Sequence, residues 1–353
     1  MAGPYVHCLV SRESLKNLYT DTSLNRFRSI TNPDEGAPNF PYVCLGSVSP
    51  DFPYPALRIG INSKRDSNGW TWGDKFHKQN TGNFIDIGIQ QLQGISDKNS
   101  DLFQKKTAWL MGYYSHVITD LVIHAVVYDL VGGCYENHSH DHLHCEVIED
   151  SLLFYDLYSD PPQELIDVGF LKMILEKCQV EGPYDTTPTP LPTYVFDTDI
   201  EDLWDFILRQ NYSDFYTTET PKIDDWYSIY KALVIDATKV VARTLEPSMA
   251  YHKTTDIADN DKTRYYSAIS LPDGTKGHYK DKVFNRVVEE VTRRAKDFLG
   301  ALDNPELSLA LKKDLGNWNL DKGTIDDHSP QFALWSGKTE FPFDCDGDPP
   351  RTS

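Results

Sequence analysis

The stretch that decides the fold is Ala108–Gly133, AWLMGYYSHVITDLVIHAVVYDLVGG. It is long and almost wholly apolar, but it carries His116, Asp120 and His124, each four residues after the last. Side chains four residues apart lie on the same face of an α-helix, with their Cβ atoms about 5–6 Å apart. The stretch therefore predicts an apolar helix with one polar stripe. We expect this helix to be buried in a soluble core, with the stripe facing a charged group.

The same stretch is long enough to span a bilayer, and a transmembrane helix is the alternative to a buried core helix. Ionisable side chains inside a membrane are costly and rare, however. Three of them at helical spacing favour the core helix, so we expect no transmembrane segment.

Helical patterns continue on both sides of this stretch, whereas clear strand signals are sparse. Ile85, Ile87 and Ile89 also alternate as a strand would, which leaves the first of the predicted helices open to that alternative. A capping sequence, Asp160-Pro-Pro-Gln163, predicts the start of a helix that runs to about Gln179. The predicted helices cover Thr81–Leu92, Asp101–Val131 with Ser100 or Asp101 as the N-cap, Asp141–Tyr158, Asp160–Gln179, Pro221–Thr244 and Lys282–Leu302.

The rest of the chain contains less regular segments. Glu181–Tyr194 is a loop rich in Pro and Thr, and the chain from Asp326 onward is rich in Pro, Gly and Asp. We predict an all-α fold with a single large multi-helix domain over residues 1–325. Residues 326–353 are predicted to form an irregular C-terminal tail.

The composition and the net charge argue against several classes of protein. The chain has 353 residues, with 34 basic against 53 acidic side chains and a formal net charge of −19. A hydrophobic content of 40% excludes a disordered protein. The negative charge argues against a general nucleic-acid binder and against docking on an anionic membrane, because both need clustered Lys and Arg.

The cysteines and the N-terminal sequence indicate in which cellular compartment the protein is expected. The six cysteines are scattered and form no CxxC pair, so neither a disulfide framework nor a thiolate zinc site is indicated. The N-terminal sequence contains no secretory signal. We expect a cytoplasmic location, with secretion by another route left open.

A second group of candidate ligands follows the long helix. The segment HSHDHLHCEVIED holds His142 and Glu146, again four residues apart. Imidazole and carboxylate are the ligands of catalytic zinc sites, and two such helices facing each other could hold more than one metal ion. An accidental His-rich loop is the alternative for this segment. Asp129 lies five residues after His124, roughly 140° away from the stripe, and is not a candidate ligand.

The order of these segments resembles the zinc-dependent phospholipase C family, whose fold is shared with fungal zinc nucleases that cut single strands. The matching pieces are an early histidine, His7, then GSVSPDFPY with Asp51 and WGDKFHKQNTGNF with His77. After them come GYYSHVITDLVIH and HLHCE, which contain the two groups described above. Five segments in the family's order cover about the first 150 residues.

The resemblance implies a centre of two or three zinc ions. In the family the helix aspartate, here Asp120, bridges one pair of metal ions. By resemblance Asp51, His77 and His116 complete one site of that pair, and His7 serves the other. The ligands implied for a third ion are His124, His142 and Glu146.

The resemblance further implies the hydrolysis of a phosphoester, most simply phospholipase C-like cleavage of a phosphodiester by a metal-activated water. Asp51 is then both a ligand and the group that orients or deprotonates the water. Because the whole chain is acidic, a zwitterionic phospholipid headgroup or a small phosphodiester is the expected substrate, and no nucleic-acid partner is expected.

Three alternatives to this function remain. A nuclease of the same fold would need a basic and aromatic groove, and the only compact basic group is Arg293, Arg294 and Lys296. A phosphohydrolase of the HD type, suggested by His140 and Asp141, would leave the polar stripe without a role. The third alternative is a non-enzymatic scaffold held together by structural zinc, although structural zinc sites are typically rich in Cys.

Overall fold

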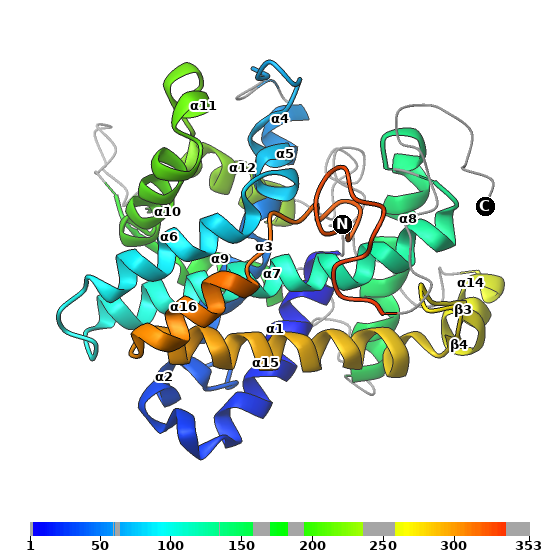
Figure 1. Ribbon diagram of the computed structural model, residues 1–353, viewed down its shortest axis with the longest axis horizontal. Coiled ribbons are helices and arrows are strands. Elements are labelled where there is room, and N and C mark those ends of the chain that lie inside the picture. The colour runs from blue at the N-terminus through cyan, green and yellow to red at the C-terminus, as the bar shows by residue number, and fades with distance from the viewer. Residues whose placement is uncertain are drawn as a thin grey trace.

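The structure is a computed structural model that describes residues 3–58, 60, 64–133, 135–157, 170–182, 194–235 and 258–336. These parts of the chain are almost wholly helical, with two short antiparallel pairs of strands (Figure 1). The predicted all-α fold is confirmed. The boundary at residue 325 stays a prediction.

The longest helix, α7 (Asp101–Val131), lies at the centre of the molecule (Figure 1). Ser100 is its N-cap and accepts a hydrogen bond from the backbone N–H of Phe103 at 3.2 Å. Gly132 ends the helix in the left-handed conformation, with φ 79°. α7 is long and apolar enough to cross a membrane, but its apolar window is 100% buried inside the protein. The chain's own helices thus cover the surface that lipid would otherwise cover.

The N-terminal half of the chain packs around α7. Its other elements are α1 (Pro4–Thr20), η1 (Thr22–Phe27), α2 (Arg28–Thr31), α3 (Phe40–Val48), η2 (Ser49–Asp51), α4 (Pro53–Arg58), α5 (Trp72–Lys78), α6 (Thr81–Gln93) and α8 (Tyr135–Leu157).

Glycines allow α3 and α7 to cross in backbone contact. A Cβ atom at Gly46 of α3 would lie 2.0 Å from the carbonyl oxygen of Trp109, and one at Gly112 of α7 would lie 2.0 Å from that of Val43. Only glycine fits at both positions. The crossing brings the residues that follow Gly46 next to the polar stripe of α7.

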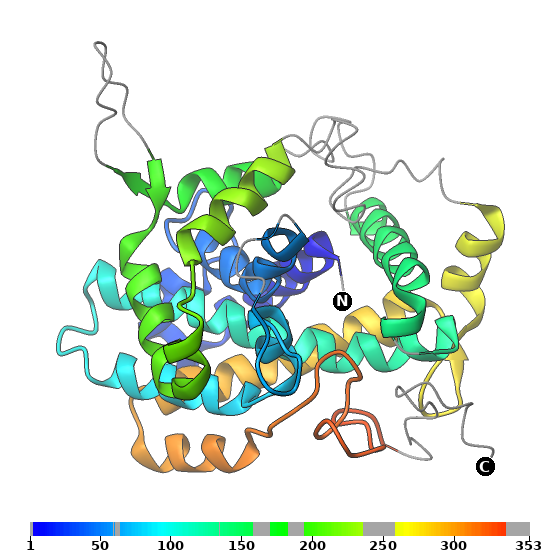
Figure 2. The same cartoon turned by 90° about the horizontal axis from the view of Figure 1, so that it is seen from above.

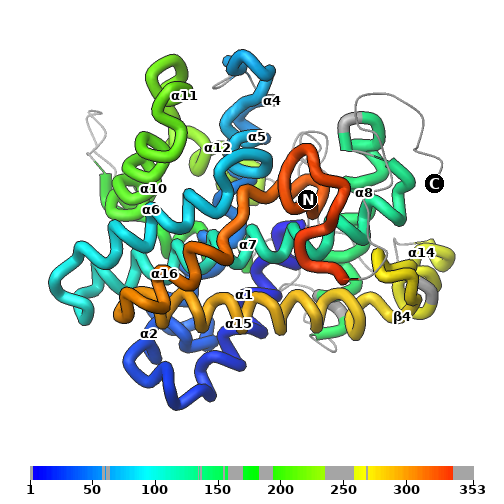
Figure 3. The backbone as a smooth tube through the Cα atoms, viewed as in Figure 1, coloured from blue at the N-terminus to red at the C-terminus, as the bar shows by residue number. Residues whose placement is uncertain are grey.

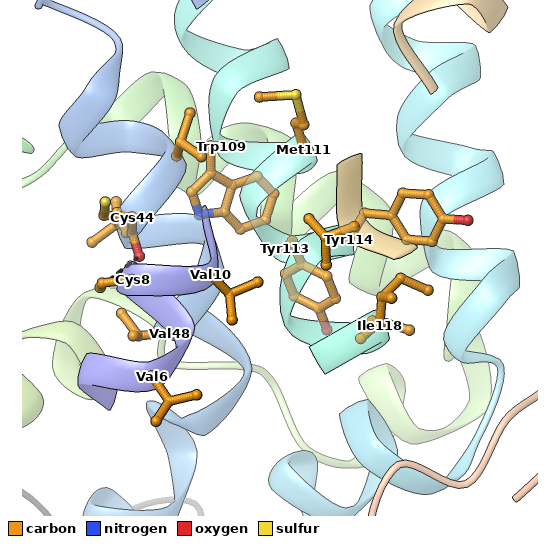
Figure 4. Packing of buried hydrophobic residues seen from close by; sticks show 14 of the residues in the cluster. Val6, Cys8, Val10, Cys44, Val48, Trp109, Met111, Tyr113, Tyr114 and Ile118 are labelled. Atoms are coloured by element: carbon orange, nitrogen blue, oxygen red, sulfur yellow. Dashed lines mark hydrogen bonds between the residues drawn. The ribbon is translucent and has the colours of Figure 1, made fainter. Parts of the chain in front are cut away.

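The core between α1, α3 and α7 is filled by interlocking apolar side chains (Figure 4). Figure 4 shows Val10 of α1 and Cys44 of α3 near the indole ring of Trp109. The indole N–H of Trp109 finds a buried partner, because it donates to Ser49 Oγ at 3.0 Å. This packing fixes α1 and η2 relative to α7.

α8 is tied to the start of α1. The carboxylate of Asp150 on α8 accepts hydrogen bonds from the backbone N–H groups of Tyr5 and Val6, at 3.3 and 2.7 Å. These bonds satisfy N–H groups that have no partner within α1. They also place the residue that follows, His7, between α8 and α7.

The C-terminal half completes the shell. Its elements are α9 (Phe170–Lys177), β1 (Gln179–Glu181), β2 (Tyr194–Phe196), α10 (Thr198–Asn211), α11 (Ser213–Thr218), α12 (Ile223–Ile235), α14 (Asp259–Thr263), η6 (Arg264–Ala268), β3 (Ile269–Ser270), β4 (Lys276–Gly277), η7 (Lys280–Phe284), α15 (Asn285–Ala301) and α16 (Pro305–Asp314). β1 pairs with β2 and β3 with β4. α15 runs alongside α7 in both views (Figures 1 and 2).

The predicted helices differ from the observed ones mainly at their ends. The helix predicted over Thr81–Leu92 is observed as α6, which extends one residue further to Gln93, and the strand alternative is wrong because the whole segment is one continuous helix. α8 starts at Tyr135, six positions earlier than predicted, and the one residue with non-helical angles is His138. The His-rich segment is thus helical and not a loop.

Other predictions reach segments that the structure does not describe. The cap at Asp160 lies outside the described residues, and the helix after it is seen as α9, which ends at Lys177 before Gln179 begins β1. α12 is described from Ile223 to Ile235, and residues 236–244 of the predicted helix lie outside the described residues. The run predicted from Lys282 begins in a π-helical turn, η7, before α15.

Residues Leu315–Trp335, which we call the strap, follow α16 and run across α7 (Figures 1 and 3). The strap has no helix or strand of its own and is held by isolated bridges between Asn319 and Thr324 and between Thr324 and Phe332. Phe332 and Trp335 are buried. Part of the predicted irregular tail is therefore packed, and residues 337–353 lie outside the described residues.

Candidate metal centre

Five elements carry the eight predicted ligands. The histidines, Asp120 and Glu146 are buried, whereas the carboxylate of Asp51 keeps 14% of its surface exposed. The ligands are His7 on α1, Asp51 on η2, His77 on α5, His116, Asp120 and His124 on α7, and His142 and Glu146 on α8.

The carboxylate of Asp120 lies at the middle of four histidines. Its Oδ2 is 3.2 Å from Nε2 of His116 and 3.7 Å from Nε2 of His77. Its Oδ1 is 3.3 Å from Nε2 of His7 and 3.8 Å from Nε2 of His124. Because each oxygen faces different imidazoles, this carboxylate has the geometry of a group that bridges two cations.

Two sets of ligand atoms are compact enough to hold an ion. One set is His7, His116 and Asp120, and the other is Asp51, His77 and His116, with the ligand atoms of each set within 4.8 Å of one another. In the second set Oδ1 of Asp51 lies 3.3 Å from Nε2 of His77. The sets share His116, so the two positions adjoin.

The protons of two histidines are fixed by backbone carbonyls. Nδ1 of His116 donates to Ser47 O at 2.9 Å, and Nδ1 of His77 donates to Gly73 O at 2.8 Å. Each imidazole then turns its Nε2 toward the centre, and these two Nε2 atoms are only 3.2 Å apart. Two imidazole nitrogens this close beside a carboxylate need a shared proton or a metal cation between them. This arrangement is typical of metal-ligating histidines.

His124 follows the same pattern from the other end of the stripe. Its Nδ1 donates to the carbonyl oxygen of Leu320 in the strap at 2.5 Å. Its Nε2 has no hydrogen-bond partner among the described residues, and the same is true of Oδ1 of Asp51 and of both ring nitrogens of His7. Buried polar atoms normally have hydrogen-bond partners, so the arrangement of these atoms is one that the binding of a cation would satisfy. The donor set of imidazoles and carboxylates suits zinc.

Electrostatics leave most of the imidazoles neutral, as metal binding requires. Burial lowers the pKa of His124 to about 4 and that of His142 to about 3. Burial, and after it the electrostatic influence of His116, also lower the pKa of His7. His77 differs: burial lowers its pKa, but the carboxylate of Asp51 at 3.3 Å and nearby negative charges outweigh burial and raise the pKa to about 9.

The two carboxylates of the compact sets are ionised. Burial by itself would raise the pKa of Asp120, but His116 and His124 hold it well below its usual range. Burial opposes ionisation of Asp51 as well, and His116 and His77 outweigh it and lower its pKa. The centre thus offers negative charge to a cation.

The remaining predicted ligands, His142 and Glu146, belong to neither compact set. Nε2 of His142 lies 3.1 Å from the carbonyl oxygen of Gly133, so the ring donates there and leaves Nδ1 as its free lone pair. The ring is near enough to His124 for the charge of that residue to lower its pKa. The assignment of a third ion to α8 stays a prediction.

Two residues beside the centre were missed by the sequence reasoning. Asp321 of the strap is 13% exposed and forms an ion pair with Lys78 at 3.3 Å. Burial would raise its pKa, but Lys78, His77 and His124 lower it to about 2. The hydroxyl of Tyr54 lies 3.2 Å from Nδ1 of His77. Tyr54 follows Asp51 closely in the sequence, whereas no spacing rule connects Asp321 with the polar stripe.

The comparison with protein families decides the identity of the fold. The sequence profile of the family described as zinc dependent phospholipase C matches residues 6–213, which is more than half of the chain. The chain belongs to the zinc dependent phospholipase C family. The resemblance predicted from the sequence is confirmed. No curated protein and no solved structure matches the chain.

The match to zinc dependent phospholipase C spans all eight predicted ligands and ends well before the strap. The family's dependence on zinc agrees with the donor set of the compact sites. The strap, with Asp321, lies beyond the matched residues.

Proposed function

We propose that the protein is a zinc-dependent hydrolase of phosphoesters, most simply one that cleaves a phosphodiester in the manner of a phospholipase C. The observation that carries the proposal is the convergence of Nε2 atoms on a shared carboxylate. Asp120 faces His7, His77 and His116 at 3.2–3.7 Å. Family membership supplies the zinc dependence.

In this proposal the chain holds two or three zinc ions through the eight predicted ligands. When bound, zinc lowers the pKa of water from 15.7 to about 7 and offsets negative charge on phosphoryl oxygens. The chain's own groups orient the reactants: the carbonyls of Ser47 and Gly73 hold the rings of His116 and His77 in place. Asp120 keeps the two adjoining positions at a fixed separation.

Asp51 is the group we propose as the base. Its carboxylate is ionised, as its lowered pKa requires, and its side chain, 14% exposed, is the less buried of the two carboxylate side chains in the compact sets. A water molecule arriving from solvent can therefore meet Asp51 beside His77. The carboxylate orients that water and accepts its proton as the phosphorus is attacked.

The substrate we propose is a small phosphodiester or a zwitterionic phospholipid headgroup, because the net charge of −19 repels polyanions. The one compact basic group is engaged elsewhere. Arg293 contacts Glu290 at 2.9 Å, Lys296 contacts Asp21 at 2.6 Å, and Arg294 is buried. These acidic partners partly neutralise the group, which disfavours it as a nucleic-acid groove and so disfavours the nuclease.

We also propose a reducing, cytoplasmic compartment. The cysteines that the structure describes are buried and free, which suits a chain that does not depend on disulfides. They are Cys8, Cys44, Cys145 and Cys178.

The test is chelator-sensitive hydrolysis combined with metal analysis. Protein expressed with ample zinc should contain at least two zinc ions per chain by elemental analysis. It should cleave a chromogenic phosphodiester that carries a choline headgroup, lose the activity in chelator, and regain it with added zinc.

The outcomes separate the alternatives. Zinc content below one equivalent would overturn the metal centre. Zinc without hydrolysis of any phosphodiester would favour the scaffold. Faster cleavage of a single-stranded oligonucleotide than of the choline ester would favour the nuclease.

A further inference from the structure

The strap connects two helices of the metal centre through one residue. The backbone N–H of Leu320 donates to the carbonyl oxygen of His77 at 2.6 Å. The carbonyl oxygen of Leu320 accepts from Nδ1 of His124 at 2.5 Å. One peptide segment thus spans α5 and α7 and sets the ring orientation of a candidate ligand.

The strap is anchored firmly enough on α7 to hold that position. Gly323 has φ 69°, and a Cβ there would lie 2.8 Å from the carbonyl oxygen of Leu121 and 3.0 Å from the backbone nitrogen of Ala125. The absence of a side chain lets the strap touch the helix backbone. Trp335 adds a second anchor, because its indole N–H donates to Val122 O at 3.0 Å.

Asp321 follows Leu320 directly, and this fixes where its carboxylate lies. The carboxylate forms an ion pair with Lys78, the neighbour of His77. Its negative charge also acts on His77, His124 and His142, whose pKa values it raises. A single carboxylate of the strap, placed by Leu320 beside His77 and His124, is therefore close enough to act electrostatically on histidines of α5, α7 and α8.

We infer that Asp321 is a positioning residue of the metal centre, whose negative charge strengthens the binding of zinc between α5, α7 and α8. The inference rests on the proposed function for the presence of zinc, and it adds a residue from beyond the part of the chain that the family profile matches. The eight ligands include only three carboxylates, so a further negative charge close by reduces the net positive charge of the loaded centre.

The competing explanation is that Asp321 only secures the strap through Lys78. The two explanations predict effects of opposite sign. If Asp321 acts on the cations, removing its charge weakens zinc binding, whereas removing the positive charge of Lys78 leaves zinc binding equal or tighter. If the ion pair only holds the strap, both substitutions loosen the ring of His124 and both weaken zinc binding.

The experiment measures zinc affinity by competition with a chromogenic chelator in Asp321→Asn, Lys78→Met and Asp321→Glu. The control is Asp327→Asn, which removes the charge of another strap carboxylate, one that pairs with Lys322 at 3.3 Å and accepts a hydrogen bond from the side-chain amide of Asn319 at 2.7 Å. Thermal unfolding of each zinc-free variant reports damage to the fold.

We expect Asp321→Asn to weaken zinc binding about tenfold or more, the range seen when partners of metal ligands are removed. Asp321→Glu should restore most of the affinity, and Asp327→Asn and Lys78→Met should not weaken it. Equal weakening in Asp321→Asn and Lys78→Met would overturn the inference, and so would unchanged affinity in Asp321→Asn. A wild-type protein that binds no zinc would instead overturn the proposed function.

Discussion

Asp51 and Asp120 are both carboxylates of the candidate metal centre, but their surroundings differ. Asp120 is fully buried among histidines, whereas the side chain of Asp51 is 14% exposed and lies 3.3 Å from His77. A bridging group has to be enclosed by its cations, and a base has to meet water. The difference in burial therefore suits Asp120 to the bridging role and Asp51 to the role of base that we propose.

Asp51→Asn should separate proton transfer from metal binding. The amide keeps the size of the side chain and one oxygen, but it loses the charge and the basicity. General-base assistance typically contributes about 10²–10⁴ in rate. We expect phosphodiester hydrolysis to fall at least about a hundredfold while elemental analysis finds most of the zinc retained.

Two results would contradict this role of Asp51. Near-normal turnover in Asp51→Asn would mean that the water is activated without the carboxylate. Complete loss of zinc would make Asp51 a ligand before it is a base.

The sequence predicts some residues of the candidate centre from local spacing and others only through the family resemblance. The stripe of His116, Asp120 and His124 follows from helical spacing, since positions four apart share a face. His7 and Asp51 could be named only through the family resemblance, because nothing in their local sequence distinguishes a ligand from an ordinary buried or turn residue.

Asp321 could be predicted from neither helical spacing nor the family resemblance. Its position depends on the packing of the strap against α7, which is decided by the conformation of Gly323 and by the anchor at Trp335. Such packing is a tertiary property that no local pattern encodes.

At the scale of elements, α7 was predictable and α8 only in part. The long apolar sequence and the capping Ser100 predict the bounds that the structure shows for α7, Asp101–Val131. The start of α8 was misplaced because His138 breaks the regular helical angles, and the residues before it show no apolar periodicity. The polar stripe of α7 is therefore the firmest place to test the metal centre.

Asp120→Ala and Asp129→Ala form a matched pair on α7. Asp120 is buried and faces four histidines, whereas Asp129 is exposed. Removing Asp120 takes a ligand from the set with His7 and His116 and takes a carboxylate oxygen 3.7 Å from Nε2 of His77 away from the other set, so hydrolysis and zinc content should fall together. Asp129→Ala should leave both close to wild type. Equal effects of the two substitutions, measured by turnover and elemental analysis, would show that the centre does not lie on this face.

At the scale of the whole molecule, the ligands tie distant parts of the chain together. They extend from His7 to Glu146, and the strap adds contacts from Leu320. In the zinc-free protein these buried imidazoles are enclosed without a cation. The fold keeps His7, His124 and His142 neutral, and this makes its stability depend on pH.

His124 and His142 each make the fold less stable as the pH falls, whereas Glu149 and Asp150, whose pKa values burial raises, contribute with the opposite sign. The folded pKa values of the two histidines, about 4 and about 3, lie below the ordinary value of 6.5. Between pH 6.5 and pH 4 these histidines bind protons in the unfolded chain but not in the folded chain, so their contribution to the free energy of unfolding falls as the pH falls. From pH 6.5 to pH 5 each histidine should contribute a loss of about 1.5 kcal/mol.

Urea unfolding of the zinc-free protein at pH 6.5 and pH 5 measures this loss. His77 does not reverse it, because a folded pKa of about 9 makes its contribution disappear only as the pH rises above 6.5 toward 9. The carboxylate of Asp321, with a pKa of about 2, keeps its charge throughout the window. Replacing both His124 and His142 with Gln should remove this loss, and the difference between the two proteins separates the histidines from the other titrating groups. An equal change in stability of the wild-type protein and the double variant would mean that these histidines accept protons in the folded state, and that the centre is open to water when zinc is absent.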